Sequence, residues 1–269
     1  MQEQPLMSHI VELISRLRKA LYTILISFIL VFAFKYSIIR IDPPGILIIV
    51  PTPSIDDSLS VSVINFFIHA TVPKGVEIIT ISPFDPLLAA AQISLFLAVI
   101  IALPIILWEV WAFISPGLYS HEKRMLKISV LPAMVLFALG ALFAYTIIIP
   151  VIFKFFLFYA KALNVEPTIS LRSFVQTILA LMLSMGLAFQ TPLIMTILTR
   201  FRIVKASTWR QYWRWGVLAS FLFALIISPG TTGGVIETTI GLTMSALYIV
   251  GMLTSMVVER RQPHVEKAS

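Results

Sequence analysis

Cysteine is absent from the sequence, and charged residues are scarce. The lack of cysteine excludes a disulfide framework and a thiolate metal site. Charged residues make up 12% of the chain, whereas roughly a quarter is usual in soluble domains. The sequence has no G-x-S-x-G motif, no aspartate cluster that suggests phosphotransfer and no histidine within a segment predicted to span the membrane. Nothing therefore indicates an enzyme, a catalytic residue, a metal or a cofactor.

What the sequence has instead is apolar surface. Hydrophobic residues make up 58% of the chain, and the mean hydropathy is +0.95. A soluble protein of 269 residues could not cover this much apolar surface, so lipid is the expected solvent. The predicted fold class is an all-α polytopic membrane protein.

Six apolar segments are predicted to form transmembrane helices: residues 21–39, 87–114, 128–158, 178–201, 215–227 and 235–258. The third is long, and Pro150 is expected to break it near the outer face. The fifth would measure only about 20 Å as a helix, against a hydrocarbon core of about 30 Å. With the tight "SPGTTGG" turn, the fifth and sixth segments are predicted to form a short hairpin.

Basic residues set the predicted orientation, because positively charged loops stay in the cytoplasm. Of 20 basic residues, one side of the predicted spans holds only Lys35, Arg40, Lys74, Lys154, Lys161 and Arg172. The other 14 lie on the opposite side, which places both termini in the cytoplasm (N-in, C-in). The net charge of +7 is then explained by topology, and nucleic acid is not an expected partner.

The whole chain, 1–269, is predicted to form a single membrane domain. Residues 1–20 carry apolar side chains at helical spacing and are expected to form an amphipathic helix at the cytoplasmic surface. Residues 41–86 are rich in proline and β-branched residues and are expected to form an extracytoplasmic cap. Residues 259–269 are expected to be a cytoplasmic tail.

Polar and helix-bending residues within the spans are the first candidate sites. Pro104, Pro132, Pro150 and Pro192 are expected to kink spans two to four, which could create a concave face for another helix; ordinary tolerance of proline in membrane helices is the alternative. Gln190 lies near the middle of span four, where its amide needs a partner. Pro192 leaves the carbonyl of Ala188 without its helical donor, which makes that carbonyl one expected partner. Two roles are open for Gln190: an interhelical hydrogen bond that only stabilises packing, and a functional polar site that faces the interior of the bundle.

Two acidic residues stand out on the predicted cytoplasmic face. Glu12 lies in the N-terminal helix and Glu122 in the basic loop after span two, so both are expected at the same membrane level. A pair of carboxylates there could bind a guanidinium group through two hydrogen bonds, which lysine matches poorly. Solvated ion pairs are the alternative, and Glu12 and Arg16 have the spacing of such a pair.

Four blocks of the sequence resemble, in order and spacing, signature blocks of the TatC family, the six-span receptor subunit of the twin-arginine protein translocase. They are "SHIVELISRLRKAL", "LPIILWEVWAFISPGLYSHEKR", "YTIIIPVIFKF" and "MGLAFQTPLIM". The resemblance implies a multi-pass protein of the cytoplasmic (inner) cell membrane that exports folded proteins, driven by the proton-motive force. It also implies binding to twin-arginine signal peptides and assembly with single-span TatA/TatB-type subunits into an oligomeric complex.

Carried over residue by residue, the resemblance assigns signal-peptide binding to Glu12, Phe113 and Glu122, and maps Pro104 to the family's proline in span two. The chain departs from the family pattern at three positions. Ile14 replaces the usual arginine, Gln190 replaces the usual intramembrane glutamate, and the usual acid near the start of span six is displaced, with Glu237 the nearest candidate.

A small secondary transporter with six spans is the alternative from another functional class. Such a transporter is expected to show an ionisable residue at mid-membrane and matching broken spans in two repeated halves. Neither feature is evident in the sequence.

Overall fold

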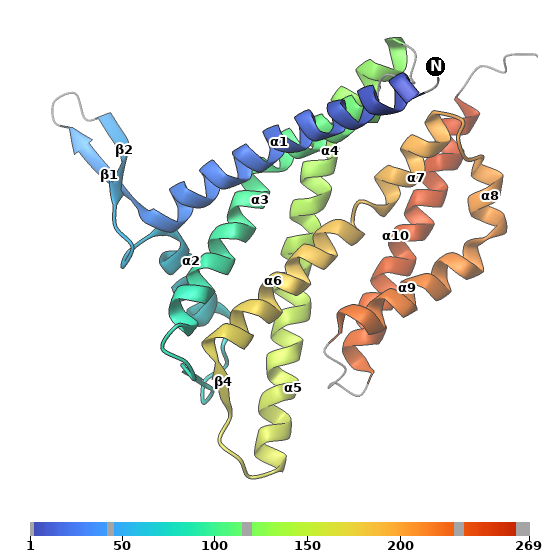
Figure 1. Ribbon diagram of the computed structural model, residues 1–269. Coiled ribbons are helices and arrows are strands. Elements are labelled where there is room, and N and C mark those ends of the chain that lie inside the picture. Colours follow the sequence, from blue (N-terminus) through green and yellow to red (C-terminus); the bar gives the residue numbers. More distant parts are fainter. Residues whose placement is uncertain (1–2, 42–45, 115–119, 229–233, 262–269) are drawn as a thin grey trace, which may run out of the picture. The chain divides into compact units, whose positions relative to one another are not determined.

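A computed structural model describes residues 3–41, 46–114, 120–228 and 234–261, and within these ranges it leaves the side chains of residues 3–10, 38–41, 46–49, 111, 113–114 and 120–127 undescribed. Helices dominate the described chain, and the strands form two small pairings (Figure 1). The chain divides into two compact units, residues 1–130 with 159–179, and residues 131–158 with 180–269. Each unit is described by itself.

The first unit is built on two long helices that pack against each other, α1 (Glu3–Ala33) and α3 (Asp85–Ile114). Between them the chain forms α2 (Leu59–Thr71) and the short strand β3 (Glu77–Ile79), which pairs in parallel with β4 (Thr168–Ser170). The start of α3 is fixed by Asp85, whose carboxylate accepts hydrogen bonds from the backbone N–H groups of Ile81 and Ser82, both at 3.0 Å.

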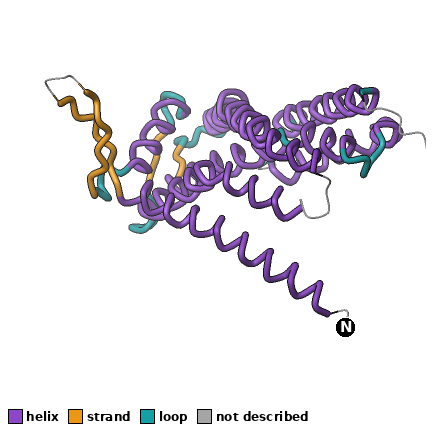
Figure 2. Tube along the Cα trace, turned by 90° about the horizontal axis from the view of Figure 1, so that it is seen from above, coloured by secondary structure: helices purple, strands orange, loops and turns teal. Residues whose placement is uncertain are grey.

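The first predicted span, 21–39, is wrong at its end. Helix α1 ends at Ala33, and Phe34–Ile41 forms strand β1, antiparallel to β2 (Ile46–Pro53), in register from Phe34 with Pro53 to Ile41 with Ile46. Both strands are rich in β-branched residues, which pack better on a pleated strand than in a helix. Figure 2 shows the two strands of this hairpin wound around each other, to one side of the helices of its unit. The region expected to be a cap, 41–86, thus contains strand β2, helix α2 and strand β3.

The second unit contains the later part of α4 (Ser120–Phe143), the π-helix η2 (Ala144–Ile148) and most of α5 (Ile149–Ala162). The later part of α6 (Leu171–Ala188) follows, then α7 (Thr191–Arg200), α8 (Ala206–Gln211), α9 (Trp213–Ile227) and α10 (Val235–Arg260). Helix α10 packs against both α7 and α9. The predicted limits of the last hairpin, 227 and 235, are confirmed.

Glycines allow close approach of helices in the second unit. A Cβ atom at Gly140 of α4 would lie 2.3 Å from the backbone oxygen of Met185 in α6, so no side chain separates these two backbones. Beside this point, the ring of Phe137 fills the space where Gly186 lacks a Cβ. The crossing of α4 and α6 therefore depends on two residues without side chains.

Pro150 does not break the third predicted span. The helix continues from Ile128 to Ala162 over 35 residues, and η2 lies immediately before α5, whose second residue is Pro150. Proline has no N–H and its ring collides with the carbonyl four residues earlier, here that of Thr146 within η2. The wider π-turn relieves this conflict and allows the helix to continue.

Four helices in the described part of the chain are long and apolar enough to cross a membrane: Asp85–Val110, Ile128–Ala162, Leu171–Arg200 and Val235–Arg260. Helix α9 is apolar but shorter. The apolar part of α1, residues 20–33, would be about 21 Å long. The protein is thus mostly helical, and its apolar helices are those of a multi-pass membrane protein.

Candidate functional site

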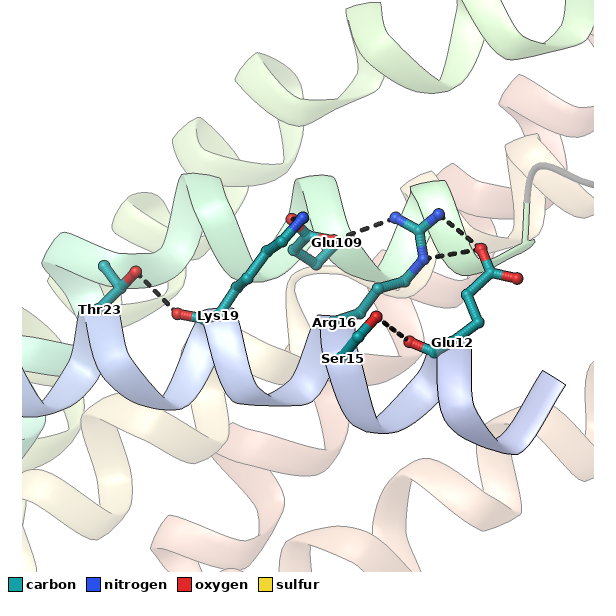
Figure 3. A network of polar contacts seen from close by, with 6 residues as sticks. All are labelled: Glu12, Ser15, Arg16, Lys19, Thr23 and Glu109. Carbon is teal, nitrogen blue, oxygen red and sulfur yellow. Dashed lines mark hydrogen bonds and ion pairs between the residues drawn. The ribbon is translucent and has the colours of Figure 1, made fainter. Parts of the chain in front are cut away.

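Polar side chains follow one edge of α1 where it lies against α3. Glu12, Arg16 and Lys19 are spaced by four and three residues, which places them on the same side of the helix. All three point toward α3, from which Glu109 points back (Figure 3). Several apolar residues of α1, among them Ile14 and Leu17, are exposed instead. The helix thus turns its charged edge to the protein and its apolar face outward.

Arg16 is held between two carboxylates. Its Nε and Nη2 atoms donate to Oε1 of Glu12, at 3.1 and 2.6 Å, and its Nη1 donates to Oε2 of Glu109 at 3.0 Å (Figure 3). The planar guanidinium can serve both acids at once because its donors point in fixed, diverging directions. The hydrogen bonds that Arg16 donates to Glu12, and secondarily the one that it donates to Glu109, raise the pKa of Arg16 above its ordinary value. Arg16 is therefore charged throughout the usable pH range.

Glu109 is the more deeply placed of the two acids. Its side chain is 12% exposed, against 33% for Glu12, and its second oxygen lies 3.6 Å from Nζ of Lys19. The two carboxylates are thus matched by two cations from α1. A charge at this depth is stabilised only because it is paired.

The ion pair between Glu12 and Arg16, which their spacing offered as the alternative, is present, but the contribution of Glu109 was missed. A signal for it exists in the sequence. Glu109 is the only ionisable residue in the apolar segment 87–114, and an isolated acid in such a segment needs a partner.

Phe113 and Glu122 lie in the same compact unit as Glu12. Phe113 is in the last turn of α3, four residues after Glu109, and Glu122 is in the first turn of α4. The structure does not describe the side chains of Phe113 and Glu122. Among the described side chains, Glu12 and Glu109 are two carboxylates that share one partner, Arg16. The predicted pairing of Glu12 with Glu122 lies outside the described side chains.

Gln190 lies where the fourth predicted span is interrupted, between α6 and α7. Its Nε2 donates to the backbone oxygens of Ala133, at 3.0 Å, and Gly186, at 3.3 Å. The expectation that the Gln190 amide bonds to the carbonyl of Ala188 was wrong. The backbone N–H of Gln190 bonds to Leu187, which leaves the carbonyl of Gly186 available to the side chain.

The remaining predicted positions are spread over both units. Pro104 lies inside α3 and is half-buried, and Pro192 is buried in the first turn of α7. Glu237 is buried in the first turn of α10, where it accepts a hydrogen bond from the hydroxyl of Ser228 at 2.6 Å. Among the residues that the structure describes, no group of three His, Cys, Asp or Glu side chains could hold a metal ion.

Comparison with known proteins extends over nearly the whole chain. The family model described as Sec-independent protein translocase protein (TatC) matches residues 8–257. The TatC protein of Aquifex aeolicus is 32% identical over 72% of this chain and 80% of its own length. That of Campylobacter jejuni is 29% identical over 84% of each chain.

The fold is similar as well. A crystal structure of the twin-arginine translocase receptor TatC superimposes with a TM-score of 0.73 at 27% identity, over 93% of this chain and 99% of that one. The four sequence blocks quoted above all begin and end within the matched residues. The chain therefore belongs to the TatC family and is a multi-pass membrane protein of the Sec-independent protein translocase type.

Proposed function

We propose that this protein is the receptor subunit of a twin-arginine translocase. It binds Arg-Arg signal peptides of folded cargo on the cytoplasmic side, and export is driven by the proton-motive force. The match to the family over residues 8–257 and the similarity to a translocase receptor structure support this role.

The main observation in support of arginine recognition is the contact between Glu12 and Arg16. The Glu12 carboxylate already accepts two N–H groups of a guanidinium, that of Arg16, in the described structure. Both bonds end on Oε1, so this carboxylate engages two of the forked donors of arginine, whereas the ammonium of lysine offers a single point of charge. Glu12 is therefore suited to select arginine over lysine in a peptide.

The proposed docking surface comprises Glu12, Phe113 and Glu122. Phe113 ends the helix that carries Glu109, and Glu122 begins the next helix. A peptide with two arginines needs more than one carboxylate, because it must approach a loop that also contains Lys123, Arg124 and Lys127. Glu122 would supply the second negative charge.

The proposed setting is the cytoplasmic membrane, with six spans and both termini inside. Besides the four long apolar helices, α9 and the apolar part of α1 would cross, and their lengths of about 21 to 23 Å require a locally thinner bilayer. Kinks at Pro104 and Pro192 would give a concave face for single-span TatA/TatB-type partners in an oligomeric complex. Gln190 would be an uncharged polar residue of the intramembrane machinery.

Binding of synthetic signal peptides to the purified full-length protein tests this proposal. Charge-assisted hydrogen bonds contribute about 1.5–3 kcal/mol each, so Glu122→Ala is expected to weaken Arg-Arg peptide binding about ten- to hundredfold. Glu12→Ala should act in the same direction. The parent should prefer an Arg-Arg over a Lys-Lys peptide, and this preference should shrink in both variants.

Glu166→Ala is the matched control, because it removes one exposed acid from the same unit at a distance in sequence from the proposed surface. Its affinity should equal that of the parent. Equal binding of the Arg-Arg peptide by the parent and Glu122→Ala would assign Glu122 to ordinary loop charges.

A further inference from the structure

The Glu12 carboxylate is only partly open to an incoming peptide. Both Nε and Nη2 of Arg16 occupy its Oε1, so an arginine from outside that binds both oxygens of the carboxylate must compete with an arginine of the protein itself. The competitor is chemically the same group as the expected ligand. The proposed receptor acid therefore has an internal occupant.

The two acids that hold Arg16 differ in accessibility. Glu12 is 33% exposed and Arg16 is 23% exposed, whereas Glu109 is 12% exposed. Ion pairs that water reaches exchange at little cost in free energy, and more deeply placed pairs are harder to break. Arg16 can therefore release Glu12 while its Nη1 stays on Glu109.

Lys19 favours the same exchange. Its Nζ lies 3.6 Å from the Glu109 oxygen that Arg16 does not use, so Glu109 has a second cation at hand. Of the two carboxylates, Glu12 is thus the one that becomes available when Arg16 moves. Glu109 remains neutralised throughout.

We propose that Arg16 is an autoinhibitory arginine. It occupies Glu12 in the empty receptor and yields this carboxylate to an arginine of the signal peptide, while Glu109 holds Arg16 in the displaced position. Glu109 is then a positioning residue that acts through Arg16 and does not touch the peptide. This inference rests on the proposed function.

The test compares two arginines of the same helix. Arg16→Gln removes the occupant, and Arg18→Gln removes an equal charge two positions away, where the helix turns the side chain to the other side and where no ion pair is recorded among the described residues. Dissociation constants of a synthetic Arg-Arg signal peptide are measured on the full-length protein. Arg16→Gln should bind about three- to tenfold more tightly than Arg18→Gln.

A variant that keeps the positive charge separates the loss of the Arg16 side chain from the effect of net charge on peptide affinity. Arg16→Lys leaves a cation but cannot bridge both acids, so it should bind the Arg-Arg peptide more tightly than Arg18→Lys. The thermal unfolding midpoint of each variant shows whether the fold is retained. Arg16→Lys, as the more conservative change, carries the test if Arg16→Gln does not fold.

Glu109→Gln tests the positioning role. In the parent it should weaken Arg-Arg peptide binding about two- to threefold, since Arg16 then rests wholly on Glu12. In Arg16→Gln the same change should have no effect. A loss of affinity there would mean that Glu109 contacts the peptide, which contradicts the positioning role.

The outcomes separate this inference from the proposed function. If the parent prefers Arg-Arg over Lys-Lys but the Arg16 variants bind no more tightly than their Arg18 controls, Arg16 is a structural clamp and only this inference fails. If the parent does not distinguish the two peptides, the receptor role fails and the inference fails with it.

Discussion

At the scale of single residues, Gln190 joins two helices through one nitrogen atom. Its Nε2 donates to Ala133 of α4 and to Gly186 of α6, two carbonyls within the same compact unit. Both partners are acceptors, so the site needs a donor and not a charge. This explains how an uncharged amide can serve at the position where the family pattern has a glutamate.

Gln190→Leu should lower the free energy of unfolding by about 1–3 kcal/mol, because the carbonyls of two buried residues lose a donor. Gln190→Glu should be destabilising as well when ionised, since a carboxylate brings no donor. Denaturant unfolding in detergent measures both. Gln176→Leu, at an exposed position of α6, is the control, and its stability should be close to that of the parent. If Gln190→Leu and Gln190→Glu were as stable as this control, the two hydrogen bonds would contribute nothing to stability.

At the scale of helices and strands, the crossing of α4 and α6 is the closest approach that a glycine allows among the described residues of the second unit. At Gly140 an added Cβ would meet backbone atoms of Met185, which can move only if helix α6 moves with them. At Gly216 an added Cβ would meet the ring of Tyr248 instead, and a side chain can turn.

Gly140→Ala should therefore be more destabilising than Gly216→Ala. Overpacking of this kind typically costs about 1–3 kcal/mol, and the cost rises when the neighbour is backbone. Thermal unfolding of the two purified variants gives the comparison. The reverse order of stability would contradict the close backbone contact at Gly140.

The length of the apolar segments predicted most helices, but not the elements that interrupt them. The run 34–41 continues the hydrophobicity of α1, and only its pairing with 46–53 makes it a strand, which depends on contacts distant in sequence. The π-turn before Pro150 likewise depends on a conflict between one ring and one carbonyl. Of the site, Glu12 and Arg16 followed from helical spacing, whereas Glu109 needed the packing of α1 on α3.

At the scale of the whole molecule, the prediction to test is topology. The asymmetry of basic residues places both termini in the cytoplasm and the stretch "SIDDS", residues 54–58, outside. A reporter fused after Ser269 should be active in the cytoplasm, and one inserted at Asp56 should be active outside. A C-terminal reporter that is active only outside would overturn the six-span arrangement.

The pairing of Arg16 with Glu12 has a consequence for the selectivity of the proposed receptor. Because the two residues are one helical turn apart, Arg16 is present near Glu12 at an effective concentration on the order of millimolar or more. A lone arginine from solution offers the same guanidinium group as Arg16 and adds no contact of its own. Under the autoinhibition proposed above, a ligand that adds further contacts next to its arginine would displace Arg16 more readily than a lone arginine would, so the internal pair would set a threshold for binding.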